Sequence, residues 1–196
     1  MAQTRRKAGI ARRGAPTTRL RKKVTLVVDT REPASLDAEI EAVGFEVFRQ
    51  TMPTGDFLWV AKDGRSIAVE RKTAGDLLSS IGGRQANGHS RLQNQMERMV
   101  KEFDVPLLLI EGNLQGGSDG FTTAGTRSTK WYWDSVDNLL MSLQRGGITV
   151  VHCARGRVPE RLVTLNYYFD RKVHTLLSPV VVDSRVEESP EREEAA

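Results

Sequence analysis

Acids and bases gather where the sequence predicts strands to end, and their types suit hydrolysis of a phosphate ester. They occur as DTRE at 29–32, GD at 55–56 and ERK at 70–72. Because successive side chains of a strand alternate between its faces, we expect Glu70 and Lys72 on one face and Arg71 on the other. A carboxylate pair can hold a divalent cation against a phosphate, while a lysine positions or deprotonates the attacking water. The pattern therefore indicates a metal-dependent nuclease, although taken alone it is more often a surface network of ion pairs.

Alternating strands and helices supply the positions for these residues. Apolar runs of strand length are followed by segments with apolar residues at helical spacing, which predicts a single α/β sheet flanked by helices. The expected strands are 24–30, 45–51, 57–62, 66–72, 105–112 and 148–153, and the expected helices are 35–43, 74–81, 91–103, 130–145 and 159–177. Residues 82–90 and 113–129 are interpreted as loops, the second long and flexible.

The turn between the third and fourth expected strands decides whether two carboxylates face the same way. Asp56 and Glu70 can share a metal only if paired residue numbers across this antiparallel hairpin sum to an even value. A two-residue turn gives odd sums, whereas a three-residue loop with Gly64 in the left-handed region pairs Ala61 with Arg65. The chemistry therefore predicts a bulge at Gly64 that places Asp56 opposite Glu70.

Five short motifs, taken together, are more specific than the charges alone. They are DTRE (29–32), GDF (55–57), VERKTAGD (69–76), RLQNQMERM (91–99) and LLLIEG (107–112), in this order. They resemble the nuclease domain of the XPF-type structure-specific endonucleases, a group that includes archaeal Hef. The resemblance implies a restriction-endonuclease-like core with a mixed central sheet. It also implies cleavage of branched or flapped DNA with Mg²⁺ or Mn²⁺, during repair, recombination or replication.

The resemblance also assigns roles to residues. Matched by motif, the catalytic set is Asp29, Glu32, Asp56, Glu70, Arg71, Lys72 and Asp76. The implied metal ligands are Asp56, Glu70 and the backbone carbonyl of Arg71, and Lys72 matches the catalytic lysine. Three of the acids could instead only orient their neighbours, namely Asp29, Glu32 and Asp76.

Basic residues outside the carboxylate motifs indicate contact with DNA. Residues 1–23 carry nine Lys or Arg and no acid, whereas residues 183–196 carry a net charge of −4. The family arginine that precedes a helix corresponds to Arg84 or Arg91, and we prefer Arg91 because the helical pattern continues from it. The candidate DNA-binding residues are Arg12, Arg13, Lys22, Lys23, Arg31, Arg84 and Arg91. The expected organisation is a disordered basic arm (1–23), a nuclease domain (24–177) and an acidic disordered tail (178–196).

Several partner classes are not expected. No apolar run approaches the ~18 residues of a membrane span, and the first twenty residues lack the apolar region of a secretion signal. The single cysteine, Cys153, excludes a disulfide framework, and no P-loop indicates a nucleotide cofactor. We expect an intracellular protein, cytoplasmic or nucleoid-associated if the source is prokaryotic or viral. The resemblance further implies a homodimer, for which residues 148–177 offer apolar side chains: Leu165, Tyr168, Phe169 and Leu176.

Two alternative functions stay open. The family includes catalytically silent DNA-binding subunits, but these typically lose the ERK string that is present here at 70–72. A nuclease acting on ordinary duplex ends is the other alternative. Most relatives carry a tandem helix-hairpin-helix module after the nuclease domain, whereas the residues after 177 here are valine-rich and then acidic, so the preferred DNA structure is left open.

Overall fold

A mixed six-stranded sheet forms the centre of the protein. The structure is a computed structural model that describes residues 19–171. The strands run in the order β2-β1-β3-β4-β5-β9, with β3 antiparallel to both of its neighbours and the other pairs parallel. Their bounds are β1 Val24–Asp29, β2 Phe45–Gln50, β3 Phe57–Val60, β4 Ser66–Thr73, β5 Val105–Glu111 and β9 Thr149–Cys153. This is the mixed sheet expected from the sequence, and every residue of its β5 strand is buried.

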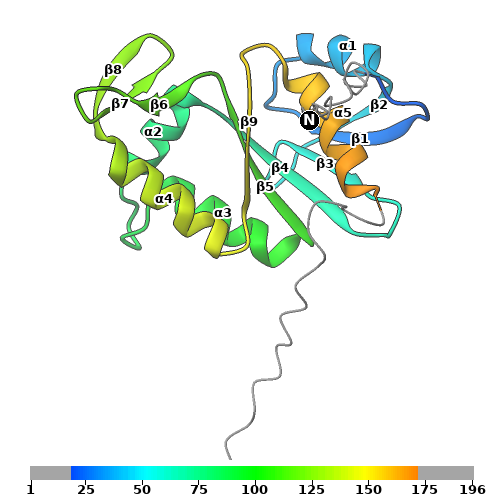
Figure 1. Ribbon diagram of the computed structural model, residues 1–196. Coiled ribbons are helices and arrows are strands. Elements are labelled where there is room, and N and C mark those ends of the chain that lie inside the picture. Colours follow the sequence, from blue (N-terminus) through cyan, green and yellow to red (C-terminus); the bar gives the residue numbers. More distant parts are fainter. Residues whose placement is uncertain (1–18, 172–196) are drawn as a thin grey trace, which may run out of the picture.

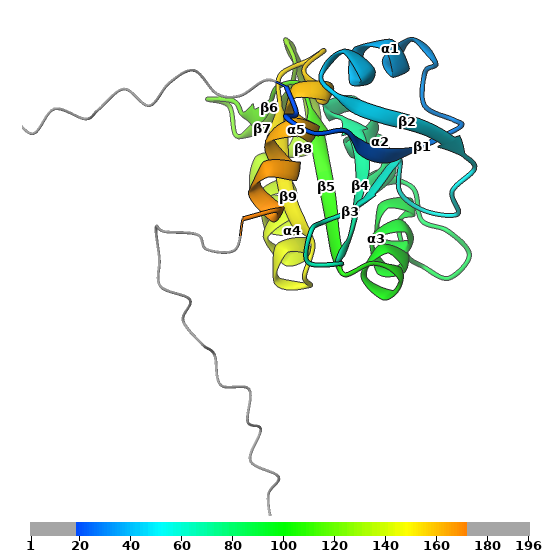
Figure 2. The ribbon, with the colours of Figure 1, turned by 90° about the vertical axis from the view of Figure 1, so that its right-hand side faces the viewer.

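Five helices cover the two faces of this sheet (Figures 1 and 2). Helices α1 (Ser35–Ala42) and α5 (Val158–Phe169) pack on one face. Helices α2 (Ala74–Gly82), α3 (Arg91–Glu102) and α4 (Trp133–Arg145) pack on the other. None of the helices within residues 19–171 is long and apolar enough to cross a bilayer.

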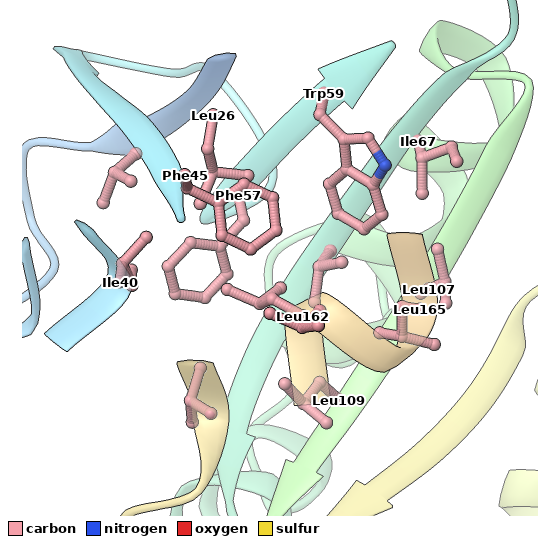
Figure 3. Close-up of a cluster of buried hydrophobic side chains, with 14 of the residues drawn as sticks. Leu26, Ile40, Phe45, Phe57, Trp59, Ile67, Leu107, Leu109, Leu162 and Leu165 are labelled. Carbon is pink, nitrogen blue, oxygen red and sulfur yellow. The ribbon is translucent and has the colours of Figure 1, made fainter. Parts of the chain in front are cut away.

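Each face has its own apolar core, because strand side chains alternate between the faces. Phe57, Trp59 and Val69 join the core under α1 and α5, drawn in Figure 3. Leu58 and Ala68 point to the core under α2, α3 and α4. The charged residues that end β4 continue this alternation, so consecutive charges lie on opposite faces.

The β3–β4 hairpin has the predicted register. Phe57 pairs with Val69 and Val60 with Ser66, so every pair sums to 126. The Ala61 N–H donates to the Arg65 carbonyl (2.9 Å) and Gly64 has a φ of +88°. The three-residue loop with a left-handed glycine is therefore confirmed.

The interpretation of residues 113–129 as a flexible loop is wrong. A second sheet of three short antiparallel strands forms there, with strands β6 (Leu114–Gly116), β7 (Phe121–Ala124) and β8 (Arg127–Tyr132). Its turns use Gly120 and Gly125, both with positive φ. Polar, threonine-rich strands of three to six residues give almost no hydrophobic periodicity, although the turn glycines were a usable signal.

The helix expected from residue 130 begins only at Trp133 as α4, since 130–132 belong to β8. Trp131 is half-buried against the core under α2 and α4. Tyr132 is 62% exposed and its ring stacks on Phe121, with centroids 4.8 Å apart.

Some sequence predictions fall outside the described residues. These are most of the basic arm with Arg12 and Arg13, the acidic tail, and the last turns of the expected helix 159–177, including Leu176. Of the apolar residues offered for a dimer, Leu165 is 4% exposed in the protein's own core, so it is not available to a partner. Phe169 is partly buried against the same core and Tyr168 is 49% exposed.

Candidate active site

Asp56 enters the site from the residue just before β3. Its backbone is held on both sides, since its N–H donates to the Val69 carbonyl (2.7 Å) and its carbonyl accepts from the Asp29 N–H (2.9 Å). Its Oδ2 accepts from the Arg71 N–H at 2.7 Å. Burial, and then the neighbouring charge of Glu70, raise the pKa of Asp56 to about 7.

Glu70 lies in β4 on the face covered by α3, and its side chain is 3% exposed. Lys72, two residues along on the same face, forms an ion pair with Glu70 Oε1. Asp56, Glu70 and Lys72 are therefore brought together as the motif predicts.

Gln95 is a site residue that the sequence reasoning missed. Its Nε2 donates to Glu70 Oε1 at 2.9 Å, and its Oε1 is buried without a hydrogen-bond partner. It belongs to α3, whose first turn is capped by Ser90 Oγ accepting from the Gln93 N–H. The motif RLQNQMERM already contained Gln95, but only the packing of α3 against β4 shows which of its residues faces Glu70.

Arg71 points to the opposite face from Glu70, as the strand alternation requires. Its guanidinium donates to Glu32 Oε2 (2.8 Å) and to Glu111 Oε2 (2.5 Å), and Glu111 Oε1 accepts from the Gly156 N–H (2.7 Å). Burial is the main reason that the pKa of Glu32 is raised, although the charge of Arg71 opposes this. Arg71 thus ties together the ends of β1, β4, β5 and β9. Glu111, in the motif LLLIEG, was not recognised as part of this network.

Asp29 and Asp76 both make local hydrogen bonds, Asp29 to backbone groups and Asp76 to the Thr73 side chain. Asp29 is fully buried and accepts from the N–H groups of Arg31 (2.8 Å) and Met52 (2.6 Å). Burial acts to raise its pKa, but these bonds and the Arg31 guanidinium outweigh it, so the pKa lies below its usual value. Asp76 is exposed in the first turn of α2, where its N–H donates to the N-cap Thr73 Oγ1 (3.2 Å) and its Oδ2 accepts from the same hydroxyl (2.6 Å). Both acids make the contacts of residues that orient their neighbours.

The candidate DNA-binding cations are dispersed over the surface. Arg31 is 63% exposed but its guanidinium is held by Asp29 (2.5 Å) and the Met52 carbonyl (2.9 Å). Arg84 donates to the Gly88 carbonyl within the 83–90 loop, whereas Arg91 is exposed at the first position of α3 and has no ion pair within residues 19–171. The remaining described pair is exposed at the end of the arm: Lys22 and Lys23.

The donor set fits a hard divalent cation. Within residues 19–171, no three side chains of His, Cys, Asp or Glu are grouped to hold a metal ion. The carboxylates of Asp56 and Glu70 nevertheless repel each other, and a cation between them would cancel this repulsion. Gln95 adds an amide oxygen without a hydrogen-bond partner beside Glu70. Because the N–H and C=O of one strand residue point to the same neighbour, the Arg71 carbonyl points to the side of Asp56. Oxygen donors of these kinds are the ones that Mg²⁺ accepts.

Comparisons with known proteins give the family of the chain and proteins of similar fold. Residues 28–157 match the ERCC4 domain. The chain is 31% identical over 103 residues to the DNA repair endonuclease UVH1 of Arabidopsis thaliana, which covers 52% of this chain and 10% of that protein. XPF from Aeropyrum pernix has a similar fold, with a TM-score of 0.54 and 24% identity over 75% of this chain and 63% of that one. Its complex with DNA gives a TM-score of 0.52 and 23% identity, over 78% and 68% of the two chains.

Proposed function

This chain belongs to the ERCC4 domain family, and we propose on that basis that it is a metal-dependent DNA endonuclease. The observation that carries the proposal is the convergence of Asp56, Glu70 and Lys72 at one edge of the sheet. The chain spans a tenth or less of the length of the curated relatives that it matches. The activity of those longer proteins is therefore a proposal for this chain.

Asp56, Glu70 and the carbonyl oxygen of Arg71 would hold Mg²⁺ or Mn²⁺. When bound, such a cation would polarise the scissile phosphate and lower the pKa of a coordinated water. The protein's own part is to keep its donors in place. Arg71 holds Asp56 through its N–H and anchors β4 through Glu32 and Glu111, while Gln95 holds the Glu70 carboxylate.

Lys72 is suited to handle charge at the reacting phosphate. Its ammonium group is largely buried, at 12% exposure of the side chain, and its ion pair with Glu70 keeps it within the site. In this position it can orient the attacking water and offset the negative charge that develops on the phosphate.

We propose branched or flapped DNA as the substrate. The support is the motif resemblance to structure-specific nucleases and the sequence similarity to the A. thaliana DNA repair endonuclease UVH1. The A. pernix protein of similar fold has been solved with DNA. We also propose a homodimer, supported by the same resemblance and by the exposed Tyr168 on α5. Light scattering should then give twice the 21.8 kDa mass of the chain.

A cleavage assay tests the activity. The full chain is incubated with Mg²⁺ or Mn²⁺ and flap, fork, four-way, nicked and linear duplex DNAs, and branched DNAs should be cut. Glu70→Gln and Lys72→Ala should each abolish cutting while leaving DNA binding largely intact, because most phosphate contacts lie elsewhere.

Glu102→Gln, the same chemical change at an exposed residue at the end of α3, is the matched control and should cut normally. Cleavage that survives both active-site substitutions would show that another site is responsible. Binding without cleavage by the wild-type protein would favour the catalytically silent alternative.

A further inference from the structure

A large groove adjoins the carboxylate site without containing it. It has a volume of about 1450 Å³ and lies where β4, β5 and β9 end, between the start of α2 and the small β6–β8 sheet. Its lining includes Arg71 and Thr73, the neighbours of Lys72 along β4, and extends to Arg155 after β9. The Arg71 N–H also bonds Asp56, which links the groove to the carboxylate site. Sites for single small molecules are typically ~300–1,000 Å³, so this groove suits an extended ligand.

Most of the charged residues that line the groove are cations. Arg127, Lys130 and Arg155 are exposed, and none forms an ion pair within the part of the chain that the structure describes. The one acidic lining residue, Glu111, forms an ion pair with Arg71. Burial, and then the charge of Arg161, lower the pKa of the lining residue His152, which favours its neutral form. The groove therefore presents unpaired positive charge to an anion.

The groove also has an apolar part, which includes an indole ring. Leu78 and Leu114 contribute aliphatic surface, and Trp131 on β8 is half-buried beside them. A Cβ added at Gly82, which also lines the groove, would stand 3.2 Å from Trp131 Cζ2. The absence of a side chain at Gly82 thus leaves room for the indole at this edge of the groove.

We propose that this groove binds a single-stranded segment of DNA and leads it to the carboxylate site. Unpaired cations contact the phosphates, and Trp131 offers a surface on which a base can stack. A single strand fits better than a duplex, because the faces of the bases are available for stacking only when they are unpaired. The inference rests on the proposed nuclease function, which it deepens by assigning the site for an unpaired arm of branched DNA.

The test is equilibrium binding of the full chain, in EDTA, to a fluorescent oligodeoxythymidine of about twelve nucleotides, a length within single-strand site sizes. The double variant Arg127→Ala/Arg155→Ala should bind more weakly. Its slope of log affinity against log salt should be shallower by about 1.4, at roughly 0.7 for each phosphate contact on a single strand.

The matched control is Lys101→Ala/Arg145→Ala. These exposed cations lie in the last turns of α3 and α4, at the opposite edge of the sheet, and also have no ion pair within residues 19–171. This control removes the same charge and should keep the wild-type slope. An equal loss in both variants, or none in either, would overturn the groove as the binding site.

A second pair of variants tests the ring. Trp131→Leu should lower the affinity for oligodeoxythymidine roughly 5- to 100-fold. Trp131→Phe should lower it less, because phenylalanine keeps an aromatic ring for stacking and disturbs the packing of the folded protein less than leucine does. Equal affinity of the Phe variant and the Leu variant, with circular dichroism like that of the wild type, would overturn the stacking role. Because EDTA prevents cleavage, these results are separate from the nuclease assay. If the wild-type protein cuts DNA but the Arg127→Ala/Arg155→Ala variant binds oligodeoxythymidine normally, the nuclease proposal stands and only the proposed role of the groove is refuted.

Discussion

The carboxylates of Asp56 and Glu70 are both shielded from solvent and repel each other, and both conditions disfavour their charged forms in the folded protein. Hydrogen bonds keep both carboxylates in place despite this cost in free energy. Backbone groups of β1 and β4 hold Asp56, and Lys72 and Gln95 hold Glu70. Strain of this kind concentrates at functional sites. The cation proposed above would relieve the repulsion between the two carboxylates.

Replacing Asp56 by asparagine tests this electrostatic strain. The folded-state pKa of Asp56 is raised from 3.8 to about 7, so the fold favours its neutral form, and that contribution is lost as pH rises through this interval. The asparagine side chain is neutral at every pH. In EDTA, the free energy of unfolding of Asp56→Asn relative to wild type should therefore increase from pH 4 to pH 7, by up to about 4 kcal/mol, and then level off.

Urea unfolding at several pH values measures this difference. Mg²⁺ added at pH 8 should stabilise the wild-type protein and leave Asp56→Asn almost unchanged. A difference that does not vary with pH would contradict the assigned strain.

Gln95 should act as a positioning residue for Glu70. Substitution of residues that orient metal ligands typically lowers affinity or activity 10- to 100-fold. We expect Gln95→Ala to reduce cleavage by about this factor and to raise the Mg²⁺ concentration needed for half-maximal rate. Gln93→Ala is the matched control, since Gln93 is exposed on the same helix and bonds Glu97. Equal rates for the two variants would remove Gln95 from the site.

Among the elements, the β3–β4 hairpin matters most for the site, because the length of its loop determines on which face of the sheet Asp56 lies. Gly64→Ala should destabilise the protein by about 1–2 kcal/mol, since alanine rarely adopts a φ of +88°. Gly75→Ala is the comparison, because Gly75 lies in the first turn of α2 with open space around it and no positive φ. Alanine there should be neutral or stabilise by up to about 1 kcal/mol. Denaturant unfolding of both variants decides, and equal effects would contradict the role of the turn.

At the scale of the whole molecule, we predict that the basic arm (residues 1–23) adds phosphate contacts to those made by the core. Deleting residues 1–22 should weaken duplex binding most at low salt and flatten the dependence of log affinity on log salt. Four lost phosphate contacts would change the slope by roughly 3 to 4. The metal requirement and the site of cutting should be unchanged, because the carboxylates lie in the sheet. Titrations at several salt concentrations measure this, and an unchanged slope would assign the arm to another partner.

The sequence by itself determined the features that depend on neighbouring residues. Alternation along 66–73 separated Arg71 from Glu70 and Lys72, and the requirement that Asp56 and Glu70 share a face gave the correct hairpin register. The apolar run at 105–112 likewise predicted a strand, which the structure has as the fully buried β5. These signals are local, since side-chain periodicity and turn geometry act within a few residues.

Only the tertiary structure decided which polar groups meet across long separations. Gln95 reaches Glu70 from 25 residues away and Glu111 reaches Arg71 from 40, and neither contact has a periodic signal in the chain. The fold also shows that Asp29 holds the backbone of Met52 and that Asp76 bonds the Thr73 hydroxyl, contacts that their residue types do not distinguish from metal binding. The β6–β8 sheet, and the groove that it borders, could not be predicted from the sequence for the same reason. The short polar strands of this sheet are stabilised by pairing with one another and by contact with α2 and α4, and they have no hydrophobic periodicity of their own.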